Sequence, residues 1–245
     1  MFLKLCKHEI KYTYKNFMIL YVLLLLAAYS ITSILVNQGS SPYVLQWLIM
    51  YPVMVIITLL GSEILVIRAC YVSMYSKTGY LTHTLPVSTT TLFLAKLCVY
   101  TFWFLLSFVA IVASLAFILS AMPTFHTIHI TSAIVFKILF AISMQLLLSV
   151  TIILFAFSFA HSKYIRNARL YIALIILFII DFLVEVIGSH LPNASYLNAS
   201  LPTELFDMPI FNQWTTFAGI LITFAGTLLL SMATIYLMKH KMELE

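Results

Sequence analysis

The chain has 245 residues, of which 63% are hydrophobic and 9% are charged, and it carries a formal net charge of +5. Soluble domains are roughly 45 to 50% apolar, so this composition excludes a soluble globular protein and predicts an integral membrane protein. We interpret the positive charge as anchoring at the inner membrane surface rather than as nucleic-acid binding.

Six long apolar runs dominate the sequence. Each reaches the roughly 20 residues that a helix needs to cross about 30 Å of hydrocarbon. The runs lack the alternation of a barrel strand, and open strands would leave unpaired backbone groups in lipid. We therefore predict an all-α membrane protein with a single domain, residues 1–245. The expected spans are about 17–36, 43–67, 97–121, 132–160, 170–189 and 215–238.

Basic residues between the runs predict the orientation of the spans. Twelve of the thirteen Lys and Arg residues lie in four segments, which alternate with three segments that hold none. Because cytosolic loops carry the excess of Lys and Arg, both termini are expected on the cytosolic side of the plasma membrane. The four basic segments are 1–16, 68–96, 161–169 and 239–245.

Residues 1–16 are too charged to insert into the membrane, but they have a regular apolar pattern. Apolar side chains recur at steps of three and four opposite a stripe of lysines, which predicts an amphipathic helix on the inner surface. The alternative is a solvated basic tail. The apolar positions are Leu3, Cys6, Ile10, Tyr14 and Phe17, and the lysines are Lys4, Lys7, Lys11 and Lys15.

Segment 68–96 is the largest piece expected on the cytosolic side. The second helix should continue past the membrane to Lys77, and a short helix should follow over 80–85, bounded by a glycine and a proline. Ser88 is well placed to cap the helix that becomes the third span. A short amphipathic element held between two long helices can transmit force, and the alternative is an ordinary loop that only joins the spans.

Segment 190–214, expected on the outer side, is longer than a connection between two spans requires. It combines three prolines with many apolar residues, so it is too apolar for a free linker. We expect short helices here, folded back against the outer leaflet or a partner subunit.

Few ionisable residues lie inside the expected spans. Lys137 is early in the fourth span, and Asp181 and Glu185 lie one turn apart on the fifth at a similar depth. A charge in lipid is costly, so we predict a buried ion pair of Lys137 with Asp181 or Glu185. Such a pair could line a translocation path, although a structural clamp between helices is favoured. Pro52 is expected to kink the second helix.

The sequence contains no pattern of catalytic or nucleotide-binding residues. No nucleophile has a base at usable spacing, and no glycine opens a Gly-x-x-x-x-Gly-Lys-Ser/Thr loop. No pair of cysteines has metal-site spacing, and His126 and His129, three residues apart, have no nearby carboxylate or thiol, so solvated loop histidines are favoured over a metal site. We therefore expect no catalytic residue, metal or cofactor in this chain, which should not hydrolyse nucleotide alone.

One segment carries a family resemblance. Residues 77–97 are Lys-Thr-Gly-Tyr-Leu-Thr-His-Thr-Leu-Pro-Val-Ser-Thr-Thr-Thr-Leu-Phe-Leu-Ala-Lys-Leu. They resemble the cytosolic loop of ABC-2-type permeases of Gram-positive bacteria, which typically has Gly-Tyr-Leu-Thr, then Leu-Pro-Val-Ser, then Lys-Leu at the start of the third span. The chain has Thr89 where the family often has a basic residue. The layout of spans and loops resembles the family over the whole chain.

The resemblance implies a dimer of permeases, identical or different, each bound to a separate cytosolic ATPase that holds ATP and Mg²⁺. It implies a coupling helix seated in a groove of that ATPase, and a cargo path along the permease interface, lined mainly by the second and fifth spans. Size and character are most similar to exporters of phenol-soluble modulins and antimicrobial peptides, so the expected cargo is an amphipathic peptide or another hydrophobic molecule. The implied coupling residues are Gly79, Tyr80, Leu81, Thr82, His83, Thr84, Leu85 and Pro86.

Two other classes of function are open on the sequence alone. A channel or secondary carrier that works without ATP would need several ionisable or backbone-lined sites near mid-depth, whereas one ion pair is expected here. A membrane protein that senses a toxic peptide, or confers immunity to it without moving it, would be compatible with the same features.

Overall fold

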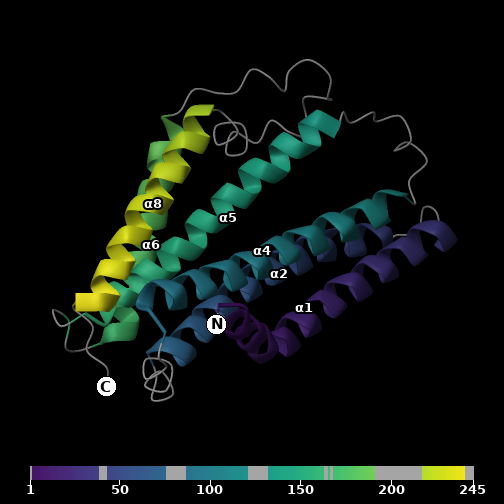
Figure 1. Cartoon of the computed structure of the whole chain (residues 1–245). Coiled ribbons are helices and arrows are strands. Elements are labelled where there is room, and N and C mark those ends of the chain that lie inside the picture. The colour runs from purple at the N-terminus through teal and green to yellow at the C-terminus, as the bar shows by residue number, and fades with distance from the viewer. Residues whose placement is uncertain are drawn as a thin grey trace. The chain divides into compact units, whose positions relative to one another are not determined.

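The computed structural model is all-helical over the residues that it describes (Figure 1). Within them lie six helices that are long and apolar enough to cross a membrane, so the chain is a multi-pass membrane protein, as its composition predicts. The described residues are 2–38, 43–75, 87–120, 132–162, 165, 168–190 and 217–240, and the side chains of 35–38, 43–49, 119, 132–139, 189, 217 and 240 lie outside the description.

The six helices follow the six predicted spans in order. They are α1 (Phe2–Gln38), α2 (Tyr43–Met74), α4 (Thr89–Ser120), α5 (Ser132–Ala160), α6 (Arg169–Ser189) and α8 (Phe217–His240). α2 continues past its apolar run, as predicted, and ends at Met74 rather than at Lys77. The short helices predicted over 80–85 and in the outer segment after His190 lie outside the described residues.

α1 joins two elements that the sequence predicts separately. The expected surface helix of residues 1–16 and the first span form one helix of 37 residues, because no glycine or proline interrupts the chain before Gly39. Such a helix is about 55 Å long, well beyond the hydrocarbon thickness, so part of it lies outside the hydrocarbon. α1 bends near its N-terminal end (Figure 1). In the N-terminal part of α1 the Thr13 hydroxyl donates to the Glu9 carbonyl at 2.9 Å, and such a contact often bends helices.

The chain divides into two compact units. The N-terminal unit is Met1–Ala69 with Cys98–Ile128, and the C-terminal unit is Cys70–Leu97 with His129–Glu245. α2 and α4 therefore contribute to both units. The stretches that flank the predicted coupling element belong to the C-terminal unit.

In the N-terminal unit, α1 packs on α4 through aromatic and hydroxyl side chains. Phe17 stacks on Trp103 with 4.6 Å between the ring centroids. The Tyr21 hydroxyl is hydrogen-bonded to Ser107 Oγ at 2.8 Å and also donates to the Trp103 carbonyl at 3.1 Å. Lipid provides little hydrophobic drive for helix association, so these contacts fix the register of the two helices.

Two more polar contacts hold this unit together. The Tyr100 hydroxyl of α4 donates to a carboxyl oxygen of Glu9 on α1 at 2.9 Å. The Tyr51 hydroxyl of α2 is hydrogen-bonded to Ser114 Oγ of α4 at 2.8 Å. α4 is therefore tied to both α1 and α2 by hydrogen bonds between side chains.

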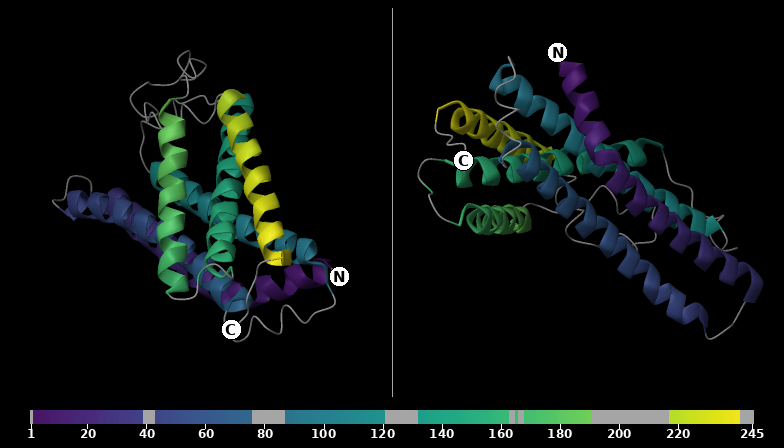
Figure 2. Two further views of the ribbon diagram at one scale, coloured as in Figure 1. Left: turned by 90° about the vertical axis from the view of Figure 1, so that its left-hand side faces the viewer. Right: turned by 90° about the horizontal axis from the view of Figure 1, so that it is seen from below.

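In the C-terminal unit, α6 and α8 pack on α5 (Figure 2). In the spanning stretch of α5, 56% of the residues are buried, against 6% for α6 and 17% for α8, so α5 is the central helix of this unit. Gly226 of α8 faces α5, because a Cβ atom added there would lie 3.5 Å from Leu148. Most of the α6 surface is left for lipid or another protein.

The contact of Tyr21 with α4 can be tested by removing one oxygen atom. Tyr21→Phe should lower the free energy of unfolding in detergent by about 1 kcal/mol, because two interhelical hydrogen bonds are lost while the ring stays. Tyr29→Phe, on the same helix at a side chain that is 64% exposed, is the matched control and should have little effect. Equal losses for the two variants would show that the hydroxyl contact does not stabilise the α1–α4 pair.

Candidate functional site

The predicted coupling element, Gly79 to Pro86, lies outside the described residues, but the structure describes both of its flanks. α2 leads into segment 76–86 at Tyr75, and the described chain resumes at Val87, just before α4. Both flanks belong to the same compact unit as α5. The candidate site is the place where these flanks are held against α5 and against each other.

The end of α2 is held on the end of α5 by ring stacking and a hydrogen bond. Tyr75 stacks on the His161 imidazole with 4.4 Å between ring centroids and 26° between the planes, and its hydroxyl is hydrogen-bonded to Ser158 Oγ at 2.6 Å. The Tyr71 ring lies 6.2 Å from Phe157 and 6.1 Å from His161. We call these five residues the α2–α5 clasp.

Helical spacing brings the clasp residues together. Tyr71 and Tyr75 are four residues apart at the end of α2, and Phe157 and His161 are four apart at the end of α5, so each pair forms one patch on its helix. The His161 ring is fixed by a hydrogen bond between its Nδ1 and the Phe157 carbonyl at 3.0 Å. Tyr75, Ser158 and His161 are all buried.

Burial moves the deprotonation of the Tyr75 hydroxyl to higher pH. Removal from water, with a smaller effect of neighbouring Cys70, raises the pKa of Tyr75 well above its ordinary value, although the bond to Ser158 opposes this. A tyrosine with a raised pKa in the folded protein loses its stabilising contribution only as the pH rises towards that pKa. The hydrogen bond of the clasp is therefore present at neutral pH.

The other flank is capped and tied to α2. The Thr91 backbone N–H donates to Ser88 Oγ at 3.3 Å, which confirms Ser88 as the cap of α4. Two turns further on, Lys96 is 1% exposed, and its ammonium group donates to Ser73 Oγ of α2 at 2.6 Å. Both flanks of segment 76–86 are thus held by side-chain contacts, the first to α5 and the second to α2.

The intramembrane residues that the sequence singles out lie on three helices. The Lys137 side chain, on α5, is outside the described part of the structure. Asp181 and Glu185, on α6, are both exposed on the single chain, so the interior of this unit does not bury them, and the ion pair with Lys137 stays a prediction. Pro52 lies inside α2, which is helical on both sides of it, and the kink also stays a prediction.

The clasp is not among the sites predicted from the sequence. Tyr71 and Tyr75 lie in a stretch interpreted only as a continuation of the second helix, and Phe157 lies in a long apolar run. The sequence nevertheless contains a pattern that could have indicated the clasp. Aromatic pairs with a spacing of four residues occur at the ends of two spans that must both finish on the same side of the membrane.

No protein-family model, no curated protein and no solved structure matches the chain. Any functional assignment therefore depends on the residues themselves. Two features bear on it: the composition of segment 77–97 and the anchoring of its flanks by the clasp.

The clasp makes a measurable prediction about stability. Tyr75→Phe should lower the free energy of unfolding by about 1 kcal/mol, because it removes the bond to Ser158 and keeps the stacking. Tyr75→Ala should cost about 3 kcal/mol, because the buried ring is lost as well. Both are measured by denaturation of the purified protein in detergent.

A double-mutant cycle separates the hydrogen bond from other effects. The cost of Tyr75→Phe should largely disappear when Ser158 is already Ala, because the two hydroxyls act as one pair. Tyr171→Phe is the matched control, since Tyr171 is 69% exposed on α6. Costs that simply add in the double variant would contradict the pairing of Tyr75 with Ser158.

Proposed function

We propose that the chain is the permease subunit of an ATP-driven exporter of the ABC-2 type. It moves an amphipathic peptide or another hydrophobic cargo out across the plasma membrane, while a separate cytosolic ATPase binds ATP and Mg²⁺. The resemblance of residues 77–97 to the permease loop supports the family, and the six apolar helices agree with its layout. The permease supplies the path and the mechanical connection, and the partner supplies the energy.

The proposal depends above all on the anchoring of the motif-bearing segment. Tyr75, the last described residue before that segment, is buried and held on α5 by its ring and its hydroxyl. A loop that only joins two spans needs no anchor on a third helix. An element that is pushed by an ATPase does need one, because the push must reach helices that line the path.

The proposed orientation places both termini in the cytosol. The N-terminal part of α1 lies along the inner surface, where its four exposed lysines meet anionic headgroups. The coupling helix over 80–85 then lies on the cytosolic side, and short helices of segment 190–214 lie on the outer side. The four lysines are Lys4, Lys7, Lys11 and Lys15.

The surface of α6 supports a second permease at this helix. Only 6% of its spanning stretch is buried, and Asp181 and Glu185 are exposed within it. Carboxylates that face lipid are costly, whereas polar groups of a partner, of cargo or of water in a path would stabilise them. We therefore assign α6 to the interface between permeases, beside the cargo path that it shares with α2.

Transport then follows from a rigid-body motion. Closure of the two ATPases on ATP moves the coupling helices, and the packed permeases rock against each other. Because the clasp ties the end of α2 to α5, the central helix of the C-terminal unit follows the coupling helix. An apolar path with few charges suits a cargo that enters from the inner leaflet.

The coupling role can be tested with the cognate ATPase. Leu81→Asp combined with Leu85→Asp should abolish the stimulation of ATP hydrolysis by the permease, because two carboxylates would enter an apolar contact. The measurement is copurification of the two subunits followed by a hydrolysis assay in lipid. An unchanged melting temperature of the isolated permease shows that the variant is folded.

Leu244→Asp is the matched control, since it makes the same change in another segment that is predicted to be cytosolic. It should leave association and hydrolysis as they are in the unmodified protein. Unchanged association and turnover in the variant with both Leu81 and Leu85 replaced would reject the coupling assignment.

A further inference from the structure

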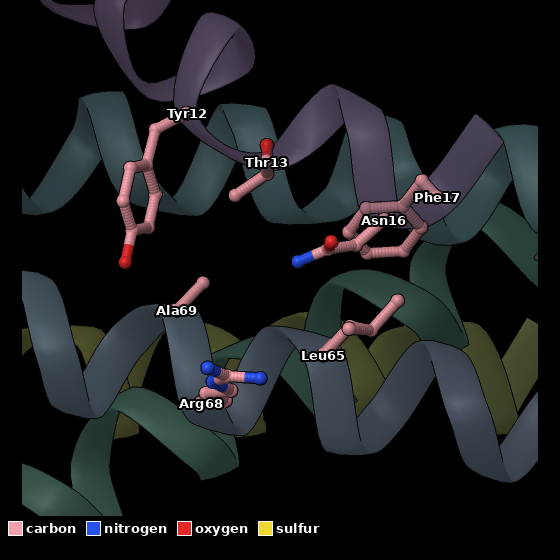
Figure 3. Close-up of a pocket in the computed structure, with 7 residues that line it drawn as sticks. All are labelled: Tyr12, Thr13, Asn16, Phe17, Leu65, Arg68 and Ala69. Atoms are coloured by element: carbon pink, nitrogen blue, oxygen red, sulfur yellow. The ribbon is translucent and has the colours of Figure 1, made fainter. Parts of the chain in front are cut away.

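A pocket of about 130 Å³ lies between α1 and α2 in the N-terminal unit (Figure 3). Its floor includes Thr13, Phe17 and Ala69, all of which are buried. The Thr13 hydroxyl donates to the Glu9 carbonyl and so does not donate into the pocket. The floor therefore provides apolar contacts for a ligand, and the hydrogen-bond donors of the pocket lie on its rim.

Three side chains with hydrogen-bond donors form the rim. Tyr12 and Asn16 extend from α1 towards α2, and Arg68 lies opposite them on α2 (Figure 3). All three are exposed, and among the described residues none of them has a hydrogen-bond or ionic partner. Among the described residues, no carboxylate lines the pocket. A phenol, an amide and a guanidinium around a small pocket can together bind an anion with several acceptor oxygens.

The position of the pocket along the two helices sets its depth in the membrane. Phe17 begins the apolar run of α1, and Arg68 directly follows the apolar run of α2. The pocket therefore lies where both helices pass from apolar to basic sequence, which is the level of the lipid headgroups. Lys11 and Lys15 are exposed on the same part of α1 but do not line the pocket, so their attraction for anions at this level is weak and screened by salt.

We propose that this pocket binds the phosphate group of an anionic phospholipid, with Arg68 as the bidentate donor and with Tyr12 and Asn16 as additional donors. The planar guanidinium of arginine matches two phosphate oxygens, which a lysine cannot do in the same way. Bound lipid then joins α1 to α2 at the headgroup level. This proposal does not rest on the exporter function, because the pocket does not include the coupling segment and lipid binding is measured on the chain alone.

The test counts lipids that the purified full-length chain retains from mixed micelles, by native mass spectrometry. Phosphatidylglycerol should bind at least about tenfold more tightly than phosphatidylcholine, whose choline is repelled by the nearby lysines. Arg68→Gln should weaken phosphatidylglycerol binding about tenfold, and Asn16→Ala about threefold, in line with a charged and a neutral hydrogen-bond donor. Lys15→Gln removes the same charge outside the pocket and should change binding less than about twofold.

Inorganic phosphate, added in excess, distinguishes a site for the phosphate group of a lipid from a site for a soluble phosphate ligand. Failure of phosphate to displace the lipid supports a lipid site, whereas displacement at low concentration supports a phosphate site that takes a soluble ligand and overturns the lipid assignment. Equal binding of the two lipids, or equal losses for Arg68→Gln and Lys15→Gln, would overturn the site altogether. The melting temperature of Arg68→Gln should match that of the unmodified protein, because this side chain is exposed.

Discussion

Inside a bilayer, apolar side chains gain little by leaving lipid for another helix, so hydrogen bonds and close packing decide how helices align. In the described part of this chain, one kind of contact recurs: a tyrosine hydroxyl on one helix is hydrogen-bonded to a serine on another. Each pair lies within one compact unit and joins helices far apart in sequence. The pairs are Tyr21 with Ser107 at 2.8 Å, Tyr51 with Ser114 at 2.8 Å, and Tyr75 with Ser158 at 2.6 Å.

The proposed function rests on the third pair. It holds the end of α2 on α5 immediately before the segment whose composition resembles a permease coupling loop, and the bond from Lys96 to Ser73 ties the start of α4 to the same place. In the proposed mechanism, a force applied to that segment passes through these contacts. It reaches the central helix of the C-terminal unit, on which α6, with its exposed carboxylates, is packed.

The sequence predicts the features that depend on local composition. Apolar runs predict the six helices, and the place of Ser88 before the third span predicts its role as the cap of α4. The charge pattern of residues 1–16 predicts an amphipathic surface helix, and the structure joins residues 2–16 to the first span in α1, because no glycine or proline interrupts the chain before Gly39. Their position on the membrane surface stays a prediction. The aromatic pairs of the clasp are visible in the sequence at the ends of two spans, but the contact between them and the burial of Lys96 depend on which side chains of distant helices meet, and local spacing does not specify this.

The sidedness of segment 76–86 is the decisive point, and it can be measured with a single cysteine. His83→Cys is placed in a chain whose three native cysteines are Ser, and Ser195→Cys serves as the counterpart in the segment expected outside. A membrane-impermeant maleimide should label position 83 in inside-out vesicles but not in intact cells, and position 195 in the opposite way. Labelling of position 83 in intact cells would contradict the coupling of this segment to a cytosolic ATPase.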